Sequence, residues 1–406
     1  MRRTARDRTK DQPKPVERIE LSEGHPRRKL ILVCVLVLIA AAAFAYGVHQ
    51  LLTVDSGWQT VQVTKSDAPD CSGDFVFQYD LSGSATPTAD FKAVTLIYAE
   101  LTKDGYALFH PTQEQAGIVN VAYLNAHPNE EVTVEPLLYE SFRAMAGTRY
   151  LYLGPVYAMH QALCFSADDE EAAQYDPDRN PEIAAFYRDV AAYAADPAAI
   201  ELELLGENRV RLNVSEEYLR YGEENGVEAY IDFGWLTNAF LIDAFAERLT
   251  AEGYTAGCIS SYDGFIRCLD RRQTVYSLNL FVRQGNTVSK PGRMDYTGPR
   301  SLVVLRDYPM NSQDTGRYYE ASDGRLLTCY IDPADGQSKS ALHELYAYAE
   351  TASCAQLALA MAPAYLADRF DAAALEAITE AGGDYLYYAD GGFRHSEASL
   401  TLQDPE

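Results

Sequence analysis

The longest apolar stretch of the chain lies near its N-terminus. Residues 30–48 are nineteen uncharged residues, mostly Leu, Val, Ala and Ile. At about 1.5 Å of rise per residue, a helix of this length crosses a hydrocarbon core of roughly 30 Å. Arg27, Arg28 and Lys29 precede it, and basic residues mark the cytoplasmic side of a membrane span. The pattern predicts one anchor in the lipid bilayer at residues 30–52. The N-terminus is then cytoplasmic and the remaining chain extracytoplasmic.

A cleaved signal peptide is the competing interpretation, because residues 40–45 are rich in small side chains. The polar leader of 29 residues and the length of the apolar run favour an uncleaved anchor instead. The leader, residues 1–29, carries ten Lys or Arg and five Asp or Glu, with little apolar content. Such a composition predicts a disordered basic segment that contacts anionic lipid.

Beyond the anchor, residues 53–73 are polar and lack a regular apolar spacing, which predicts a linker. From residue 74 onward, helical and strand periods are mixed. Thr88 begins a helical pattern that stops at Gly105. Further helices are expected from Pro136, from Pro181, and at 236–251, 353–367 and 371–381. Strands are expected at 200–205 and 209–214, which form a hairpin, at 276–282 and 301–305, and as a pair around 390–392. This mixture predicts an α/β fold, with α+β-type mixed sheets and flanking helices, over residues 74–406.

Six of the seven cysteines follow the anchor, and none of them forms a Cys-x-x-Cys pair. A three-residue loop, Tyr262-Asp263-Gly264, would place Gly264 at the left-handed position of a hairpin bulge. Cys258 and Cys268 would then lie opposite each other across the two strands. The sequence leaves open whether they form a disulfide or remain two packed thiols.

The charge of the chain divides at the membrane. Residues 30–406 contain 24 Lys or Arg against 54 Asp or Glu, a net charge of −30. Nucleic-acid binding requires a positive surface, so we expect no nucleic-acid partner. The chain also lacks the sequence signatures of zinc proteases, serine hydrolases, P-loop nucleotide-binding proteins and EF-hands. The scattered histidines, such as His110, are expected to be packed or solvated and not metal ligands.

Four segments of the folded region stand in a recognisable order. A strand, a glycine turn and a helix occupy 231–254, and a tight turn leads into a strand at 260–269. A strand that ends in Asp332-Pro333 occupies 323–337, and a helix of small residues occupies 351–367. Each segment alone has an ordinary structural explanation in helix packing, a hairpin or a turn.

Together, in this order and spacing, the segments resemble the ApbE-type FAD:protein FMN transferases over about residues 90–395. Members of that family are exported or membrane-anchored. They attach FMN through a phosphoester to a Thr or Ser of a target protein. The resemblance implies an ApbE-like, T-fold-like domain, FAD as its cofactor, and an extracytoplasmic redox protein or flavoprotein as its partner.

The resemblance also assigns individual positions. The family's Asp-Leu-Gly-Gly-Ile-Ala-Lys-Gly motif matches the segment that begins at Asp232, and its Gly-Gly-Asp-Ile turn matches 263–266. Its His-Ile-Ile-Asp-Pro strand matches 329–333, and its Ser-Glu-x-Ser-x-Leu-Asn segment matches the chain up to Asn125. The cofactor-binding residues that it implies are Asn125, Asp232, Gly234, Asn238, Asp263, Gly264 and Asp332.

The departures from the family fall on its chemistry. The positions that hold Mg²⁺ in the family are here Gln356, Ala360 and Thr237, and Mg²⁺ requires hard oxygen ligands. Cys329 stands at the family's catalytic His position. Asn238 replaces a Lys, and Asp263 brings negative charge towards a phosphate pocket. The resemblance therefore implies a degenerate homologue with no metal site at the family positions.

Two replacements for the lost chemistry can be considered. Arg267, Arg271 and Arg272 could contact phosphate or could be solvated surface residues. Asp232, Asp243 and Asp332 could form a different metal set, although Asp332 before Pro333 is typical of a turn cap.

Three functions therefore remain open from the sequence. The first is a divergent but working FMN transferase. The second is a pseudoenzyme that binds flavin or another nucleotide, and the third is a protein-interaction module at the cell surface.

Overall fold

The computed structural model describes residues 26–52, 54–64, 68–310, 312–314, 316–397 and 400–404. The chain divides into two compact units, Met1–Val54 and Asp55–Glu406. In the first unit, helix α1 covers Pro26–Leu52. Among the residues that the structure describes, no helix has both the length and the apolar character that a bilayer span requires. The anchor at 30–52 stays a prediction. The predicted leader lies outside the described residues except for 26–29, which begin α1.

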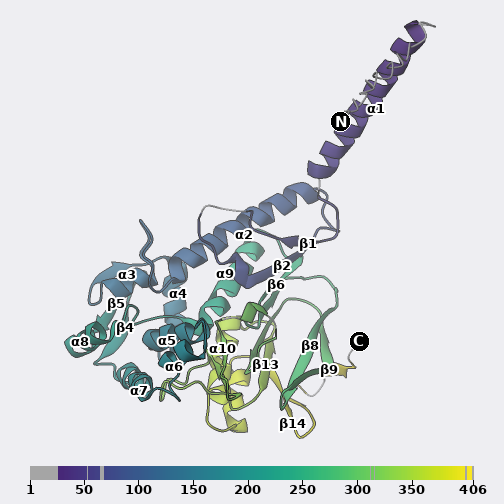
Figure 1. Ribbon diagram of the computed structural model, residues 1–406. Coiled ribbons are helices and arrows are strands. Elements are labelled where there is room, and N and C mark those ends of the chain that lie inside the picture. The colour runs from purple at the N-terminus through teal and green to yellow at the C-terminus, as the bar shows by residue number, and fades with distance from the viewer. Residues whose placement is uncertain are drawn as a thin grey trace, which may run out of the picture. The chain divides into compact units, whose positions relative to one another are not determined.

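The second unit is built on a sheet of eight antiparallel strands in the order β1-β2-β6-β7-β10-β13-β14-β15 (Figure 1). The strands are β1 Trp58–Val61, β2 Phe75–Asp80, β6 Gly257–Ser261, β7 Phe265–Cys268, β10 Arg300–Arg306, β13 Glu344–Ala349, β14 Asp384–Ala389 and β15 Gly392–His395. The prediction of helices and strands mixed along the chain, with helices flanking the sheet, is confirmed, but the strands of this sheet pair only in antiparallel fashion and do not form a mixed sheet. The predicted linker 53–73 is wrong at β1, which pairs with β2 and buries Val61. Its four residues are too few to give a readable period.

The remaining strands form three smaller sheets. They contain β3 Glu131–Thr133, β5 Arg209–Val214 and β4 Ile200–Gly206 in the first, β16 Leu402–Gln403, β9 Thr287–Tyr296 and β8 Tyr276–Gln284 in the second, and β11 Tyr318–Glu320 with β12 Leu326–Thr328 in the third. The predicted hairpin at 200–214 is confirmed as β4 and β5, which pair in antiparallel register.

Helices cover one face of the central sheet and a hairpin covers the other. The helices are α2 Pro87–Phe109, α3 Val121–Ala126, α4 Pro136–Met145, α5 Gly154–Cys164, α6 Asp169–Tyr175, α7 Pro181–Ala195, α8 Glu216–Asn225, α9 Thr237–Ala251, α10 Cys354–Tyr365 and α11 Glu376–Glu380. Of these, α9 and α10 pack on the central strands, and α2 packs on α9. On the opposite side of the sheet lie β8 and β9 (Figure 1). Because both faces are covered, all six residues of β13 are buried.

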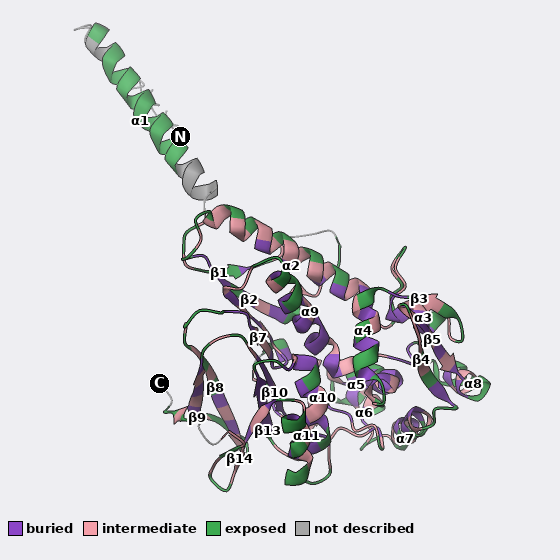
Figure 2. Cartoon of the chain, turned by 180° about the vertical axis from the view of Figure 1, so that it is seen from behind, coloured by how far each residue is buried: buried purple, intermediate pink, exposed green. Residues whose placement is uncertain are grey.

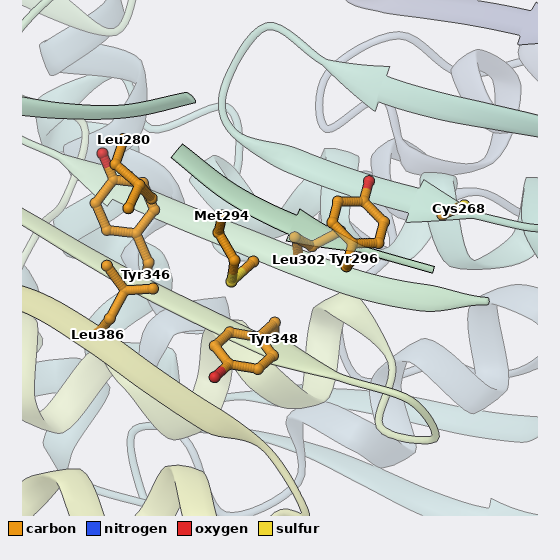
Figure 3. Close-up of a cluster of buried hydrophobic side chains, with 8 residues drawn as sticks. All are labelled: Cys268, Leu280, Met294, Tyr296, Leu302, Tyr346, Tyr348 and Leu386. Carbon is orange, nitrogen blue, oxygen red and sulfur yellow. The ribbon is translucent and has the colours of Figure 1, made fainter. Parts of the chain in front are cut away.

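The hydrophobic cluster between the hairpin and the sheet shows this arrangement in detail. Leu280, Met294 and Tyr296 of the hairpin face Leu302, Tyr346, Tyr348 and Leu386 of the sheet (Figure 3). Alternate residues of β10 and β13 point to the other face, towards the helices. Buried residues accordingly follow the central strands β7, β10 and β13 (Figure 2).

Helix α2 is longer than the sequence predicts, because it continues through Gly105 to Phe109. A Cβ atom at Gly105 would lie 2.7 Å from Cδ2 of Leu241 in α9. The glycine therefore permits the close packing of the two helices and does not end the first one. A single sequence does not distinguish these two uses of glycine.

The predicted hairpin around Asp263 is confirmed. β6 and β7 pair with Cys258 opposite Cys268, and residues 262–264 form the loop. Gly264 has a φ of +101°, and its carbonyl oxygen accepts a hydrogen bond of 2.9 Å from the N–H of Val304. Both cysteines are free thiols, the second of the two alternatives that the sequence left open.

The conformation of this loop depends on the absence of a side chain at residue 264. A Cβ there would lie 2.3 Å from the carbonyl oxygen of Val304. We expect Gly264→Ala to lower the free energy of unfolding by on the order of 3 kcal/mol, through backbone strain and a clash with β10. Gly285→Ala is the control, because Gly285 has a φ of +61° but no atom within 4 Å of its Cβ position. Gly285→Ala should lower the free energy of unfolding by roughly 1 kcal/mol. Denaturant unfolding of the full chain measures both, and equal losses would contradict the role of packing.

Candidate functional site

One cavity of about 360 Å³ collects most of the residues that the sequence singles out. Its walls come from the loop after α2, the start of α5, the segment before α9, the β6–β7 turn and two later loops. The lining residues used below are Asp74, His110, Tyr157, Ala158, His160, Asp232, Gly234, Trp235, Thr237, Asn238, Asp263, Arg317, Cys329 and Tyr330. Of the predicted cofactor-binding residues, Asn125, Gly264 and Asp332 do not line the cavity.

Asn125 holds one wall of the cavity from behind. Its side-chain oxygen accepts hydrogen bonds from the N–H groups of Tyr230 and Ile231, at 3.0 and 2.9 Å. Its Nδ2 donates to the carbonyl oxygens of Ile231 and Pro111, at 2.9 and 2.8 Å. The side chain is buried, and its contacts replace strand pairing for the segment that leads to Asp232. Asn125 is therefore a positioning residue for the cavity wall.

Asp232 and Gly234 form a tight turn into α9. Oδ1 of Asp232 accepts a hydrogen bond of 2.8 Å from the N–H of Gly234. Gly234 has a φ of +55°, and a Cβ there would lie 2.4 Å from the ring of Tyr157. The glycine thus lets the aromatic wall approach the backbone. Burial raises the pKa of Asp232 to about 6, because the charged carboxylate loses hydration there.

A polar cluster lies at the β6–β7 turn. Nδ2 of Asn238 donates a hydrogen bond of 2.9 Å to Oδ2 of Asp263, and Nη2 of Arg317 is 3.6 Å from the same oxygen. Asp74 lies beside the turn, where its carbonyl oxygen accepts a hydrogen bond from the N–H of Tyr262. Burial and the nearby charge of Asp263 raise the pKa of Asp74. Arg317 was not identified from the sequence, because only the fold brings it to this turn.

Cys329, which the sequence resemblance assigns to a catalytic position, lines the cavity as an uncharged thiol. Burial raises its pKa to about 12, so at neutral pH it is neither a base nor a reactive thiolate. The catalytic assignment of Cys329 stays a prediction. His160 lies close by, with Nε2 3.4 Å from the carbonyl oxygen of Arg317, and burial lowers its pKa to about 4. His160 was not singled out as a site residue from the sequence. It lies in helix α5, outside any catalytic motif.

His110 also reaches the cavity, through a local hydrogen-bond arrangement. Its Nδ1 accepts hydrogen bonds from the N–H groups of Thr112 and Gln113, at 3.3 and 3.0 Å. The ring proton is therefore on Nε2. Burial lowers the pKa of His110 as well, so both histidines of the cavity are uncharged at neutral pH.

The residues at the family's metal positions are used elsewhere or carry no suitable group. The side chain of Gln356 accepts a hydrogen bond of 2.9 Å from the N–H of Ser353, completing the N-terminal capping box of α10. Ala360 has no donor atom, and neither residue lines the cavity. Thr237 does line it, but its hydroxyl donates to the carbonyl oxygen of Gly234 at 2.9 Å. These three residues do not fit a Mg²⁺ ion.

The alternative metal set is also not brought together. Asp243 accepts hydrogen bonds from the N–H groups of Cys354 and Ala355, both at 2.9 Å. Asp332 caps its own turn and pairs with Lys339 at 2.8 Å, as expected for an Asp-Pro turn. Within the described part of the chain, no three His, Cys, Asp or Glu side chains form a group that could hold a metal ion.

The arginines considered as phosphate partners also lie outside the cavity. Nη1 of Arg267 donates to Asp243 and to Ser301, each at 3.0 Å. Arg272 pairs with Asp270 and Asp80, both at 2.8 Å. Arg267 and Arg272 therefore form ion pairs that stabilise the fold, and Arg271 is exposed.

Comparisons with known proteins place the fold. No protein-family model and no curated protein matches the chain. The crystal structure of an ApbE protein from Thermotoga maritima superposes with a TM-score of 0.58 at 14% sequence identity, covering 84% of this chain and 97% of that one. A mutant of the flavin transferase ApbE from Vibrio cholerae gives a TM-score of 0.47 at 14% identity, covering 80% and 93%. The superposition on the Thermotoga maritima structure shows that the chain has an ApbE-like fold, as the sequence resemblance implied.

The role of Asn125 can be tested by truncation. Asn125→Ala leaves the buried N–H groups of Tyr230 and Ile231 without their acceptor. We expect a loss of roughly 3 kcal/mol in the free energy of unfolding. Asn213→Ala is the control, because Asn213 makes one long contact of 3.4 Å with Glu203 and should change stability by less than about 0.5 kcal/mol. A small effect of Asn125→Ala in denaturant unfolding would show that the wall holds without this side chain.

The raised pKa of Asp232 predicts a pH-dependent stability. The folded state binds the proton more tightly than the unfolded state, so the stabilisation is complete at low pH and is lost as pH rises through about 6. Asp232→Asn keeps the acceptor for Gly234 and removes the charge. The variant should therefore gain stability relative to the natural chain between about pH 4 and pH 7, by roughly 3 kcal/mol at most.

Thermal unfolding at intervals across this pH range measures the difference. The control is Asp390→Asn, because Asp390 is exposed at the turn between β14 and β15. A difference in melting temperature between Asp232→Asn and the natural chain that is the same at every pH would contradict the raised pKa of Asp232.

Proposed function

We propose that the folded unit binds a flavin in the cavity and does not transfer FMN. The observation that carries this proposal is a division among the residues that the family resemblance assigns. Residues on the cofactor side, including Asp232, Asn238 and Asp263, meet in one cavity. Of the metal positions, Gln356 and Ala360 lie outside it, and the hydroxyl of Thr237 inside it donates to the carbonyl oxygen of Gly234. The cavity thus offers a place for a ring ligand, whereas its described lining does not include the metal ligands or the Lys that the resemblance assigns to phosphoryl chemistry.

The cavity has the size and the walls that a planar ring requires. Ligand sites commonly occupy about 300–1,000 Å³ and are lined by aromatic side chains with a few polar groups. Here Tyr157, Trp235 and Tyr330 line a volume of about 360 Å³. Trp235 and Tyr330 meet edge to face, with ring centroids 5.4 Å apart, which gives the wall a fixed shape. A tricyclic ring system suits this space, and the remainder of a dinucleotide would extend beyond it.

The charges of the cavity do not suit cleavage of a pyrophosphate. That reaction needs positive charge beside the phosphates, commonly from Mg²⁺, which the residues at the family positions do not fit. The one cationic side chain among the described lining residues is Arg317, and Asp263 already lies 3.6 Å from it. Cys329 is an uncharged thiol and cannot take over the part of a catalytic base.

The proposal extends to the setting of the domain. Residues 30–52 anchor the chain in the cell membrane, with the basic leader in the cytoplasm and the acidic domain outside. In this position the bound flavin would serve an extracytoplasmic redox partner. The apolar run and the charges that flank it support this part of the proposal.

Thermal unfolding of the full chain in detergent tests the proposal directly. Riboflavin, FMN and FAD are each added with Mg²⁺ or with EDTA. At least one flavin should raise the melting temperature equally in both conditions. A ligand at a hundred times its dissociation constant adds about 2.7 kcal/mol to the free energy of unfolding.

Two variants make the test specific to the cavity. Ala158 is an exposed residue of the cavity wall, and Ala158→Trp should fill the space and abolish the shift. Ala89 is an exposed alanine of α2 outside the cavity, and Ala89→Trp should leave the shift unchanged. Release of AMP from FAD in the presence of Mg²⁺, together with FMN attached through a phosphoester to a Thr or Ser of an added target protein, would instead establish a working transferase. No shift with any flavin would favour the protein-interaction module.

A further inference from the structure

Cys258 and Cys268 lie opposite each other in the β6–β7 hairpin. One step further along the same register, the N–H of Leu269 donates to the carbonyl oxygen of Gly257 at 2.8 Å, so that pair is hydrogen-bonded. The two kinds of pair alternate along an antiparallel ladder, which makes Cys258 and Cys268 a non-hydrogen-bonded pair. Such pairs bring their Cα atoms to about 4.5 Å and their side chains closest together. This spacing falls in the range of roughly 4.4–6.8 Å that a disulfide requires.

Both strands lie inside the central sheet, so each backbone is held from two sides. β6 also pairs with β2, and β7 also pairs with β10. Cys268 is 2% exposed and belongs to the buried cluster between the sheet and the β8–β9 hairpin (Figure 3). Cys258 is half-buried and packs against the same cluster. Because protein interiors are close-packed, neither side chain can turn away from the other without disturbing this core.

The two thiols are in mutual contact. The thiol of Cys258 donates a hydrogen bond to the sulfur of Cys268, and this bond lowers the pKa of Cys268. The Cys258 sulfur also lies 4.0 Å from the carbonyl oxygen of Ile259, which is a long contact. The nearby thiol of Cys354 instead donates to the carbonyl oxygen of Ile266 at 3.3 Å. Cys258 and Cys268 are therefore distinguished by having each other's sulfur as a partner.

We propose that Cys258 and Cys268 are a redox pair, which forms a disulfide by exchange with an oxidising disulfide such as oxidised glutathione. One sulfur attacks the oxidant's S–S bond and releases half of it, and the other sulfur then displaces the remaining half. One S–S bond forms in the protein as one breaks in the oxidant, whose two sulfur atoms take up the two thiol protons. The structure shows the reduced state of the pair. The proposed position outside the membrane would supply such oxidants.

The disulfide would act on the cavity through the turn at 262–264. Cys258 and Cys268 close the base of the hairpin whose turn places Asp263 in the cavity wall. A cross-link at this base removes conformations in which the two strands separate. The oxidised chain therefore holds the turn more firmly than the reduced chain, whichever ligand the cavity takes.

Peptide mapping of the full chain in detergent tests the pairing. The protein is incubated with oxidised glutathione, and the remaining free thiols are alkylated. Trypsin cleaves after Arg267, so the disulfide joins the peptides 249–267 and 268–271. Mass spectrometry without reductant should find these peptides linked, and dithiothreitol should separate them. Cys354 is the matched control, because it is as deeply buried as Cys268 but faces a carbonyl oxygen, and it should be alkylated in every sample.

Thermal unfolding measures the effect of the bond on the fold. The oxidised chain should melt a few degrees above the chain in dithiothreitol, because the cross-link restricts the unfolded state. Cys258→Ala should abolish this difference and is the milder variant, since the residue is half-buried. Cys268→Ala should do the same. Cys71→Ala should preserve the difference, because the thiol of Cys71 donates to the carbonyl oxygen of Thr102 at 3.1 Å.

The outcomes decide the proposal without reference to flavin binding. Alkylation of both Cys258 and Cys268 after oxidation would overturn it, and so would a link from either residue to a different cysteine. Linked peptides without a rise in the melting temperature would contradict the effect on the turn.

Discussion

The arrangement of the domain depends on one buried carboxylate, Asp243 of α9. It accepts hydrogen bonds from two N–H groups at the start of α10 and pairs with Arg267 of β7 at 3.0 Å. The first turn of any helix leaves N–H groups without intrahelical acceptors, and a buried helix start needs them satisfied. Asp243 meets this need from a neighbouring helix and fixes α9, α10 and the central sheet to one another. Burial raises its pKa, and these three partners oppose that effect.

This use of Asp243 has a consequence for chemistry. Both oxygens of Asp243 accept hydrogen bonds within the fold, and among the described residues no group of three His, Cys, Asp or Glu side chains forms around them to hold a metal ion. The same holds for Gln356, whose side chain completes the cap of the same helix. Polar groups around α10 thus serve the fold. Asn238 at the start of α9 and Asp263 of the β6–β7 turn line the cavity instead. The ApbE-like scaffold and the reactive positions are therefore separable, because different atoms serve each.

Local signals in the sequence predicted local structure well. The β6–β7 hairpin follows from a glycine in a three-residue loop, and its register placed Cys258 opposite Cys268. The limits of prediction lie where distant residues decide. Gly105 reads as a helix end, yet Leu241 requires it for helix packing. Strand β1 is too short to show a period, and only its pairing with β2 reveals it.

The candidate site divides in the same way. The family resemblance identified Asp232, Asn238 and Asp263 by number, because each belongs to a motif of consecutive residues. It did not identify Arg317, Asp74 or His160, because each reaches the cavity alone from a different part of the chain. Arg317 brings the one Lys or Arg charge among the described lining residues, and Asp74 adds a third carboxylate. A motif can therefore locate a cavity, whereas its charge, and with it the class of ligand, follows only once the fold brings the isolated residues together.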